Sequence, residues 1–349
     1  MAAADRANGT TSGTTNRTTS GTTIRRGIRR RTRVAALAAG ALLLGTFALP
    51  ASSATASATG SDRAGTAVAL TGRTAAAPAS GGSAGCPDDG NISLTPSTSD
   101  SGTDVQRIIR RGKLIAGIDT NSYLWGFRNP TTGDLEGFDI DLVHALAKSI
   151  LGNANAVEFL SVPTADRISA LQSGEVDVVV RTMTISCSRE QQVAFSSPYF
   201  NAGQQVLAPS SSTITGYNSS LKGKRVCAAT GSTGIAFLQQ NSFGATIVPV
   251  VNQLDCLVLM QLGTADATVT DNALAAGQIA QDPSMQLVGK LIDSENYGVA
   301  MKLGEPDLVR RVNAVLDQFR ATQWNSEYQT WLRAAMGPSS GPPSVTYAN

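Results

Sequence analysis

Hydroxyl groups and a single arginine lie close together in the stretch "TMTISCSRE", residues 182–190. The apolar run "VDVVV" just before it is typical of a buried parallel strand, so the stretch lies where a strand ends. Open α/β sheets bind ligands at such strand ends. The planar guanidinium of Arg189 is suited to a carboxylate, which it can hold with two parallel hydrogen bonds. Ser186 is expected to cap the short helix that carries Arg189. An exposed arginine after an ordinary loop is the alternative.

Two further polar clusters follow predicted strands later in the chain. The glycines of "ATGSTG", residues 229–234, let the backbone come close to a ligand, and the helix start that follows favours an anion. Ser232 and Thr233 lie in this loop, which alone could equally be a plain turn. Asp271 ends the strand "DATVTD", where it either faces a ligand or caps the helix that begins at Asn272.

The sequence offers little for catalysis or for metal binding. His144, the only histidine, lies in the middle of a predicted helix, so neither a Ser-His-Asp triad nor a zinc-bound water is expected. None of the four cysteines forms a CxxC pair, and we expect no metal site, no cofactor and no catalytic residue. Acid–base chemistry by the carboxylates of Asp119 and Asp271 is a weaker alternative.

The elements that position these residues begin at Asp104. Predicted strands and helices alternate up to residue 180, which indicates a parallel sheet with crossover helices, and a second such set follows. We therefore predict an α/β fold with two lobes, each a mostly parallel sheet flanked by helices. The cleft between two such lobes is a preferred place for a small molecule. The expected boundaries are 104–203 with 298–336 for lobe 1, 204–297 for lobe 2, 337–349 for an irregular tail, and 202–208 and 293–299 for the crossover strands.

The first hundred residues are not expected to join this fold. Residues 1–58 combine an arginine-rich leader, the apolar run "VAALAAGALLLGTFALP" and Ala56-Ser57-Ala58, an order typical of a cleaved export signal. An uncleaved membrane anchor is the alternative. Residues 59–103 have the composition of a flexible tether. The net charge of +2 owes much to the leader, so the exported chain is expected to be acidic, with no nucleic-acid partner.

The four cysteines are expected to form disulfides, because an even number in an exported chain favours them. Three pairings are possible. Cys227 and Cys256 fall in the same predicted lobe, which favours that pair together with Cys86–Cys187. Cys86 follows "SAG" as a lipidated cysteine would, but the apolar run ends far upstream, so lipidation is not expected.

Ordered motifs between about residues 104 and 336 resemble the polar amino-acid-binding proteins of ABC importers, the extracellular solute-binding proteins of family 3. The motifs are "GFDIDLVHALAKSI", "RISALQSGEVDVVV", "TMTISCSREQQVAFSSPY", "GKRVCAATGSTG", "GTADATVTD" and "WNSEYQTWL". The resemblance implies a type II periplasmic-binding-protein fold that closes on an amino acid, outside the cytoplasm, for a membrane permease. The tail and the cysteine pattern look most like actinobacterial glutamine/glutamate-binding proteins. We expect a monomer.

The resemblance also implies which residues contact the part common to all amino acids. These residues are Thr182, Thr184, Arg189, Ser232, Thr233 and Asp271. Arg189 would hold the α-carboxylate together with Thr184 and the lobe 2 hydroxyls. Asp271 and the Thr182 carbonyl would bind the α-ammonium.

The expected ligand is glutamate or aspartate, because Arg167 and Thr164 match positions that acidic-amino-acid binders use for the distal carboxylate. Asp119 favours glutamine or asparagine instead, since a carboxylate at a strand end suits a side-chain amide. Asp119 and Arg167 could also pair with each other. Arg181 replaces a small residue of many relatives and has no assigned role.

A sensor that reports to a membrane signalling partner and a dehydratase-like enzyme remain alternatives on the same fold.

Overall fold

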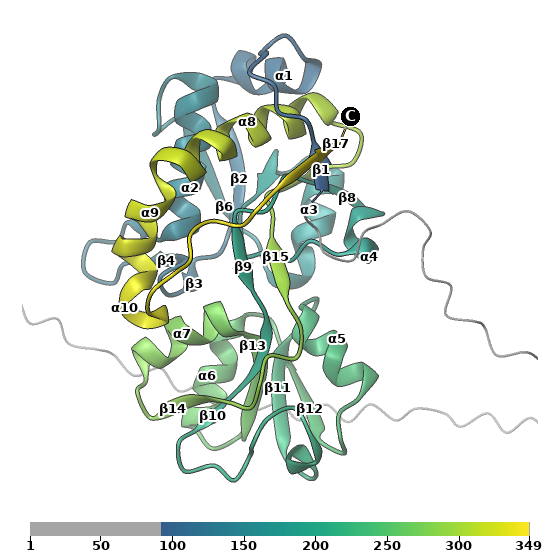
Figure 1. Cartoon of the computed structure of the whole chain (residues 1–349), viewed down its shortest axis with the longest axis vertical. Coiled ribbons are helices and arrows are strands. Elements are labelled where there is room, and N and C mark those ends of the chain that lie inside the picture. Colours follow the sequence, from purple (N-terminus) through teal and green to yellow (C-terminus); the bar gives the residue numbers. More distant parts are fainter. Residues whose placement is uncertain (1–91, 349) are drawn as a thin grey trace, which may run out of the picture. The chain divides into compact units, whose positions relative to one another are not determined.

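The computed structural model describes residues 92–348. The predicted export signal, residues 1–58, lies outside the described residues. In the described part, two lobes are joined by two short strands, β9 (Phe200–Ala202) and β15 (Glu295–Tyr297), which pair in antiparallel fashion (Figure 1). Within the same residues, no helix is long and apolar enough to cross a membrane.

Lobe 1 contains a five-stranded sheet with the strand order β6-β2-β7-β16-β8. Its strands are β2 (Leu114–Ile118), β6 (Val157–Ser161), β7 (Val178–Val179), β8 (Val193–Phe195) and β16 (Ala300–Lys302). β2 runs parallel to β6 and β7, whereas β16 runs antiparallel to β7 and β8. The crossover helices are α2 (Phe138–Leu151) and α3 (Arg167–Ser173). The carboxyl ends of β2 and β7 therefore meet at one edge of the sheet.

Lobe 2 contains a second five-stranded sheet, with the order β12-β11-β13-β10-β14. Its strands are β10 (Gln204–Pro209), β11 (Arg225–Ala229), β12 (Thr246–Val250), β13 (Ala267–Asp271) and β14 (Met285–Val288), and its helices are α5 (Thr233–Gln240), α6 (Gln253–Gln261) and α7 (Asn272–Gln281). β11 is parallel to β12 and β13, and β10 is antiparallel to β13 and β14. The predicted two-lobed α/β fold is confirmed.

A disulfide within lobe 2 joins Cys227 on β11 to Cys256 on α6, with the two Cα atoms 5.6 Å apart. This confirms the predicted pairing inside one lobe. Cys187 is disulfide-bonded as well. Cys86, its predicted partner, lies outside the described residues, so the Cys86–Cys187 bond stays a prediction.

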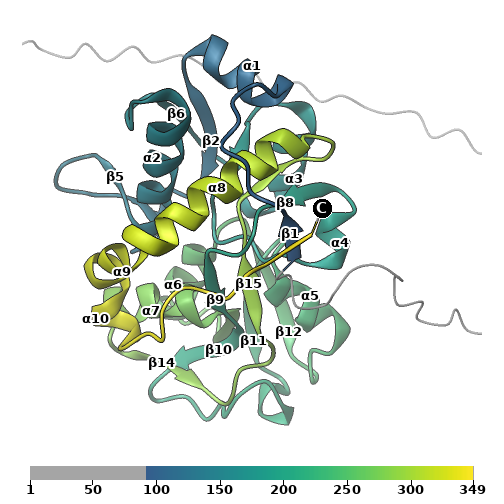
Figure 2. The ribbon, with the colours of Figure 1, turned by 45° about the horizontal axis from the view of Figure 1, so that its top comes forward.

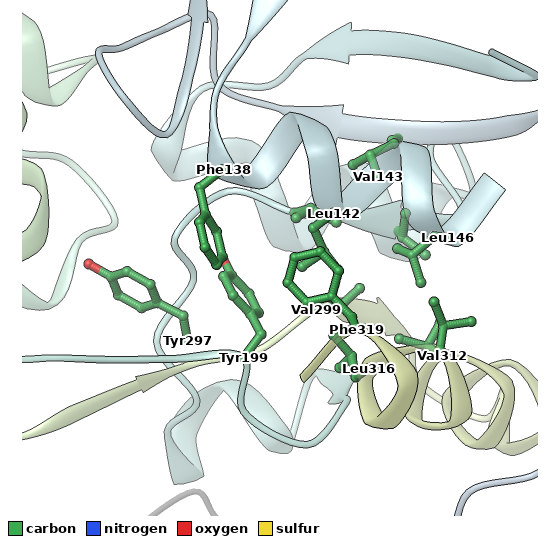
Figure 3. Packing of buried hydrophobic residues seen from close by; sticks show 14 of the residues in the cluster. Phe138, Leu142, Val143, Leu146, Tyr199, Tyr297, Val299, Val312, Leu316 and Phe319 are labelled. Atoms are coloured by element: carbon green, nitrogen blue, oxygen red, sulfur yellow. The ribbon is translucent and has the colours of Figure 1, made fainter. Parts of the chain in front are cut away.

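The larger of the two apolar clusters in lobe 1 lies where α2 packs against α8 (Pro306–Thr322), which crosses the lobe (Figure 2). Phe138, Leu142 and Leu146 recur every four residues on α2 and so share one helix face. They point toward Leu316 and its neighbours on α8 (Figure 3). Burying one large apolar side chain contributes roughly 1.5–3 kcal/mol. This packing fixes the position of α2, whose first turn supports the candidate site.

Two segments that we expected to be a tether and an irregular tail pair with each other. β1 (Ile92–Leu94) and β17 (Thr346–Ala348) form a parallel two-stranded sheet beside α8 (Figure 1). Asn313 of α8 anchors β1, because its side-chain nitrogen donates to the Leu94 carbonyl at 2.7 Å and to Ser93 Oγ at 2.9 Å. Residues 92–94 and 346–348 therefore belong to the folded part of the chain.

The remaining elements of the described part are short or peripheral. They are α1 (Thr103–Arg111), β3 (Asn121–Ser122), β4 (Gly126–Arg128), β5 (Leu135–Glu136), the 3-10 turns Thr164–Asp166 and Ser219–Leu221, α4 (Cys187–Glu190), α9 (Trp324–Glu327), a π-helical turn Tyr328–Leu332 and α10 (Arg333–Met336). Of these, α4 matters most here, because this single turn carries Arg189.

Candidate functional site

A small cavity lies where the two lobes meet. Residues of both lobes line it: Thr164, Arg167, Arg181, Thr182, Thr184, Arg189, Ser232, Thr233, Gln253, Asp271 and Leu274. The structure thus brings together every contact residue that the sequence suggested except Asp119. Arg181, Gln253 and Leu274 join the lining without having been assigned to it.

The loop after β7 is held from behind by Asp139, in the first turn of α2. Asp139 Oδ2 accepts a hydrogen bond from the Thr182 N–H at 3.0 Å, and Oδ1 accepts one from the Tyr199 hydroxyl at 2.9 Å. Thr182 has a φ of 41°, in the left-handed region, which costs a residue with a Cβ about 1–2 kcal/mol. Burial raises the pKa of Asp139 to about 7. The hydrogen bond to Asp139 offsets the strain at Thr182.

The buried guanidinium of Arg189 contacts backbone carbonyls of both lobes. Nη1 donates to the Thr184 carbonyl at 2.7 Å in lobe 1, and Nη2 donates to the Gly231 carbonyl at 3.2 Å in lobe 2. Burial lowers the pKa of Arg189. Ser186 occupies the N-cap position of α4, but its side chain makes no capping hydrogen bond, so that prediction is wrong. Its hydroxyl lies 3.3 Å from the Ser188 hydroxyl instead.

Arg167, at the start of α3, is buried with carbonyl oxygens as its hydrogen-bond partners. Nε donates to the Thr164 carbonyl at 2.9 Å, and Nη2 donates to the Gly231 carbonyl at 3.1 Å. Burial, followed by the charges of Arg189 and Arg181, lowers the pKa of Arg167 well below its usual value. A negative charge inside the cavity would therefore be strongly favoured beside Arg167.

Asp119 pairs with Arg181, and the alternative that it pairs with Arg167 is wrong. The Arg181 Nη2 and Asp119 Oδ2 atoms are 2.9 Å apart, and both side chains are buried. Arg181 Nη1 also donates to Thr164 Oγ1 at 2.9 Å. Asp119 accepts further hydrogen bonds from the Thr120 N–H and the Ser122 hydroxyl. Because these groups occupy its carboxylate behind the cavity wall, Asp119 does not line the cavity, and its contact with a ligand stays a prediction.

Asp271 lies on the lobe 2 side of the cavity, where Gln204 of β10 holds its carboxylate. Gln204 Nε2 donates to Asp271 Oδ1, and the same nitrogen lies 2.9 Å from Thr233 Oγ1. Asp271 occupies the N-cap position of α7, yet its side chain makes no capping hydrogen bond. Burial, followed by the charge of Glu295, raises the pKa of Asp271 well above its usual range. The geometry thus favours the ligand role over the capping role.

The glycine loop of lobe 2 comes into direct contact with lobe 1. Gly231 has a φ of 79°, and a Cβ at this position would lie 2.8 Å from the Cα of Ala165. Any larger residue would therefore push the lobes apart. Ser232 holds the start of α5, because its Oγ accepts from the Ile235 N–H at 3.1 Å. The Ser232 hydroxyl therefore already has one structural partner at the edge of the cavity.

Gln253 is a lining residue that sequence reasoning missed. It opens α6 and is 5% exposed, and its Oε1 atom has no hydrogen-bond partner among the described residues. A second small cavity shares Gln253 and Leu274 with the first. In the sequence, nothing distinguishes Gln253 from any other polar residue in the first turn of a helix, so only packing reveals it.

Other residues whose side chains could take part in catalysis or binding lie away from the cavity. The His144 Nδ1 atom is 2.7 Å from the Ala154 carbonyl oxygen, on the outer part of lobe 1. Trp125 is fully buried and donates from Nε1 to the Ala273 carbonyl at 3.0 Å. Among residues 92–348, no cluster of three or more His, Cys, Asp and Glu side chains could hold a metal ion.

Comparisons with known proteins show which family and which solved structures this chain is similar to. The family model of the bacterial extracellular solute-binding proteins, family 3, matches residues 114–334. The ABC transporter glutamine-binding protein GlnH of Bacillus subtilis (strain 168) is 35% identical over 222 residues, which are 63% of this chain and 81% of that protein. A glutamine-binding protein of Geobacillus stearothermophilus is 37% identical over 202 residues, 58% of this chain and 77% of that protein. Among solved structures, an ancestral arginine-binding protein bound to glutamine has a TM-score of 0.60 and 34% identity, and the match covers 65% of this chain and 99% of that one.

Proposed function

Because the chain belongs to the bacterial extracellular solute-binding proteins of family 3, we propose that it captures a polar amino acid between its lobes for an ABC importer. One observation carries this proposal: a buried arginine of lobe 1, Arg189, and a buried aspartate of lobe 2, Asp271, line the same small cavity. A zwitterion supplies one partner for each of these charges. The family description places its members outside the cytoplasm. Cleavage of the export signal and a monomeric state remain predictions.

The α-carboxylate of the ligand would bind between the lobes at Arg189. Two N–H groups of its guanidinium already donate to carbonyl oxygens, and further N–H groups remain for a carboxylate. The Thr184 N–H would add a donor from lobe 1, and Thr233 would add its hydroxyl from lobe 2. Charge-assisted hydrogen bonds of this kind are about twice as strong as neutral ones.

The α-ammonium would bind at Asp271, with the Thr182 carbonyl as a second acceptor. Asp139 fixes the Thr182 loop in its left-handed conformation before the ligand arrives. Because the loop is preorganised, binding does not have to order it. Less conformational entropy is therefore lost on binding, and the affinity is higher. The two lobes would close on the ligand by a hinge motion at β9 and β15.

We propose glutamate or aspartate as the ligand, because Arg167 lines the cavity with only carbonyl partners. Removing an arginine from water without an opposing charge is costly. Arg181, in contrast, is already neutralised by Asp119. The cavity therefore has two arginines without a carboxylate partner, and a dicarboxylic amino acid would supply one carboxylate to each.

Glutamine is the second candidate, and Gln253 favours it. Its unpartnered Oε1 atom would accept a hydrogen bond from the side-chain amide of a ligand, whereas a carboxylate has no hydrogen to offer. The named relatives from Bacillus and Geobacillus are glutamine-binding proteins, which also supports this candidate.

Titration calorimetry with each of the twenty amino acids tests both the function and the ligand. We expect glutamate or aspartate to bind most tightly to the wild type. In Arg167→Ala, their affinity should fall far more than that of glutamine and asparagine. Arg128→Ala is the matched control, because Arg128 is exposed and lies outside the cavity lining.

Each other result has a definite meaning. Tightest binding of glutamine, with a selective loss of glutamine in Gln253→Leu, would establish the second candidate. Equal losses of glutamate and glutamine in Arg167→Ala would show that Arg167 only braces the lobe. If no amino acid bound, the proposed function would be wrong.

A further inference from the structure

Glu295 is a buried carboxylate at the hinge that the proposed contacts do not use. It is 3% exposed on β15 and does not line the cavity. Its Oε2 atom accepts from the Thr184 hydroxyl of lobe 1 at 2.9 Å and from Gln204 Nε2 of lobe 2 at 3.2 Å. Its Oε1 atom has no hydrogen-bond partner among the described residues. A buried carboxylate in this position is costly unless it is paired with a positive charge or shares a proton.

Glu295 and Asp271 form one unit. The same Gln204 Nε2 atom donates to Oδ1 of Asp271 and, at 3.2 Å, to Oε2 of Glu295, so the two buried carboxyl groups are neighbours. Two ionised carboxylates side by side in a buried site would repel each other, which favours a proton on one of them. Two adjacent carboxyls in a buried site hold such a proton more tightly than either would alone.

We propose that Asp271 and Glu295 together form the ammonium subsite: the pair shares one proton in the empty cavity and releases it to solvent when the ligand ammonium binds. The inference rests on the proposed function, since it requires an amino acid at Asp271. The charge balances, because the ammonium brings the positive charge that the departing proton removes. Glu295 thereby acts as a positioning residue, through Asp271.

The surrounding charges define the controls for this assignment. Burial and Glu295 raise the pKa of Asp271, whereas Arg189 of α4 and Arg167 of α3, which face Asp271 from lobe 1, lower it. Asp293, just before β15, does not line the cavity, and its carboxylate accepts from the Gln204 N–H at 2.8 Å; burial, together with the neighbouring Glu295, raises its pKa to about 6. Tyr297 and Asp139 lie further along the same buried region. Protons taken up or lost by Asp293 must therefore be distinguished from those of the pair.

The test is calorimetry of glutamate and glutamine binding in buffers of different ionisation enthalpy between about pH 5 and pH 8. The difference in heat between two buffers gives the number of protons released per ligand. We expect the wild type to release close to one proton where the pair is protonated, and its dissociation constant to fall by up to about tenfold per pH unit there. In Glu295→Gln we expect little release and a nearly flat pH profile, whereas Asp293→Asn should keep the release.

Three results would overturn the inference while the function stands: binding without proton release in the wild type, the same release in Glu295→Gln, or loss of the release only in Asp293→Asn. Absence of binding by any amino acid would instead overturn the proposed function and the inference with it. Carbon-13 carboxyl signals of the wild-type chain give a measurement independent of any variant. We expect a protonated carboxyl from the pair without ligand and its ionisation on saturation; two ionised carboxyls without ligand would contradict the proposal.

Discussion

Arg181 and Asp119 form a buried ion pair behind the cavity, with 2.9 Å between Nη2 and Oδ2. Arg181 follows β7 and Asp119 follows β2, so the pair joins the ends of two neighbouring strands. The pair gives Arg181, which had no assigned role in the sequence, a structural role. Through its Thr164 contact, Arg181 fixes the turn that precedes Arg167.

The first prediction concerns this ion pair. Arg181→Met should lower the free energy of unfolding by about 3–5 kcal/mol, because it leaves the Asp119 carboxylate buried without its partner. The double variant Arg181→Met with Asp119→Asn should recover part of that loss. Urea unfolding of the two single variants and the double variant gives the coupling energy. Simple additivity of the two single effects would show that the pair does not couple.

The second prediction is that Arg189 is needed for every ligand. Arg189→Ala should weaken binding by about 2–5 kcal/mol, or roughly thirty-fold to several thousand-fold, because the ligand carboxylate loses its charged partner. Arg189→Lys should recover only part, since an ammonium cannot form two parallel hydrogen bonds. Calorimetry measures both variants, and Arg128→Ala is again the control. An affinity that stays at the wild-type value in Arg189→Ala would move the carboxylate subsite elsewhere.

The third prediction separates lobe closure from backbone strain. Gly231→Ala should hinder closure and reduce affinity, because the new Cβ would lie 2.8 Å from the Ala165 Cα. Gly263→Ala is the matched control: its φ is 65°, and nothing lies within 4 Å of the new Cβ. Both variants should lose about 1–2 kcal/mol of stability through strain. X-ray scattering should show compaction on ligand binding in the control and a reduced compaction in Gly231→Ala; equal compaction would contradict the predicted contact.

The fourth prediction concerns the disulfide of lobe 2. Replacement of Cys227 and Cys256 by alanine should lower the free energy of unfolding by roughly 2–4 kcal/mol, because the unfolded chain gains freedom. The double variant isolates this bond, whereas a reductant would also act on the disulfide of Cys187. Denaturant unfolding provides the measurement. A variant as stable as the oxidised wild type would mean that the bond adds nothing to stability.

The fifth prediction is a pH dependence due to Asp139. Its pKa is about 7 in the folded state against an ordinary 3.8, so the folded state binds this proton more tightly than the unfolded state. The stability that Asp139 contributes is therefore fully present below about pH 4 and is lost as the pH rises through about 7. Asp139→Asn should remove this component. Urea unfolding across that range should give a flatter curve for the variant, whereas two parallel curves would exclude Asp139 as the cause. Asp293 is present in both the wild type and the variant, so its titration affects both curves equally and cancels in the comparison.

The residues that carry the proposed recognition could be predicted from the sequence because each follows a recognisable strand. Arg189 and Thr184 come after "VDVVV", and Asp271 ends "DATVTD". Parallel strands with crossover helices bring such ends to one edge of a sheet, so the chain order already indicates where these side chains gather. The Cys227–Cys256 bond could also be predicted, because both residues fall in the same predicted lobe.

The partner of each buried charge depended on tertiary structure alone. Asp119 is equally compatible with Arg167 and Arg181 in the sequence, and only the placement of β2 beside β7 selects Arg181. Ser186 and Ser232 both precede short helices, yet only Ser232 makes a capping bond. A hydrogen bond requires its donor and acceptor within about 3.5 Å and well aligned, a condition that residue type cannot express.

The sequence by itself determined the family, the two-lobed α/β fold and the loops that meet in the cavity, because apolar periodicity and motif spacing are local properties of the chain. Only the tertiary structure decided that Gln253 lines the cavity, that Glu295 and Asp271 share the donor Gln204 Nε2, and that residues 92–94 pair with 346–348. These contacts join segments far apart in the chain. They form only when the sheets and helices pack against each other. In a close-packed interior, the position of each side chain depends on all the residues that surround it.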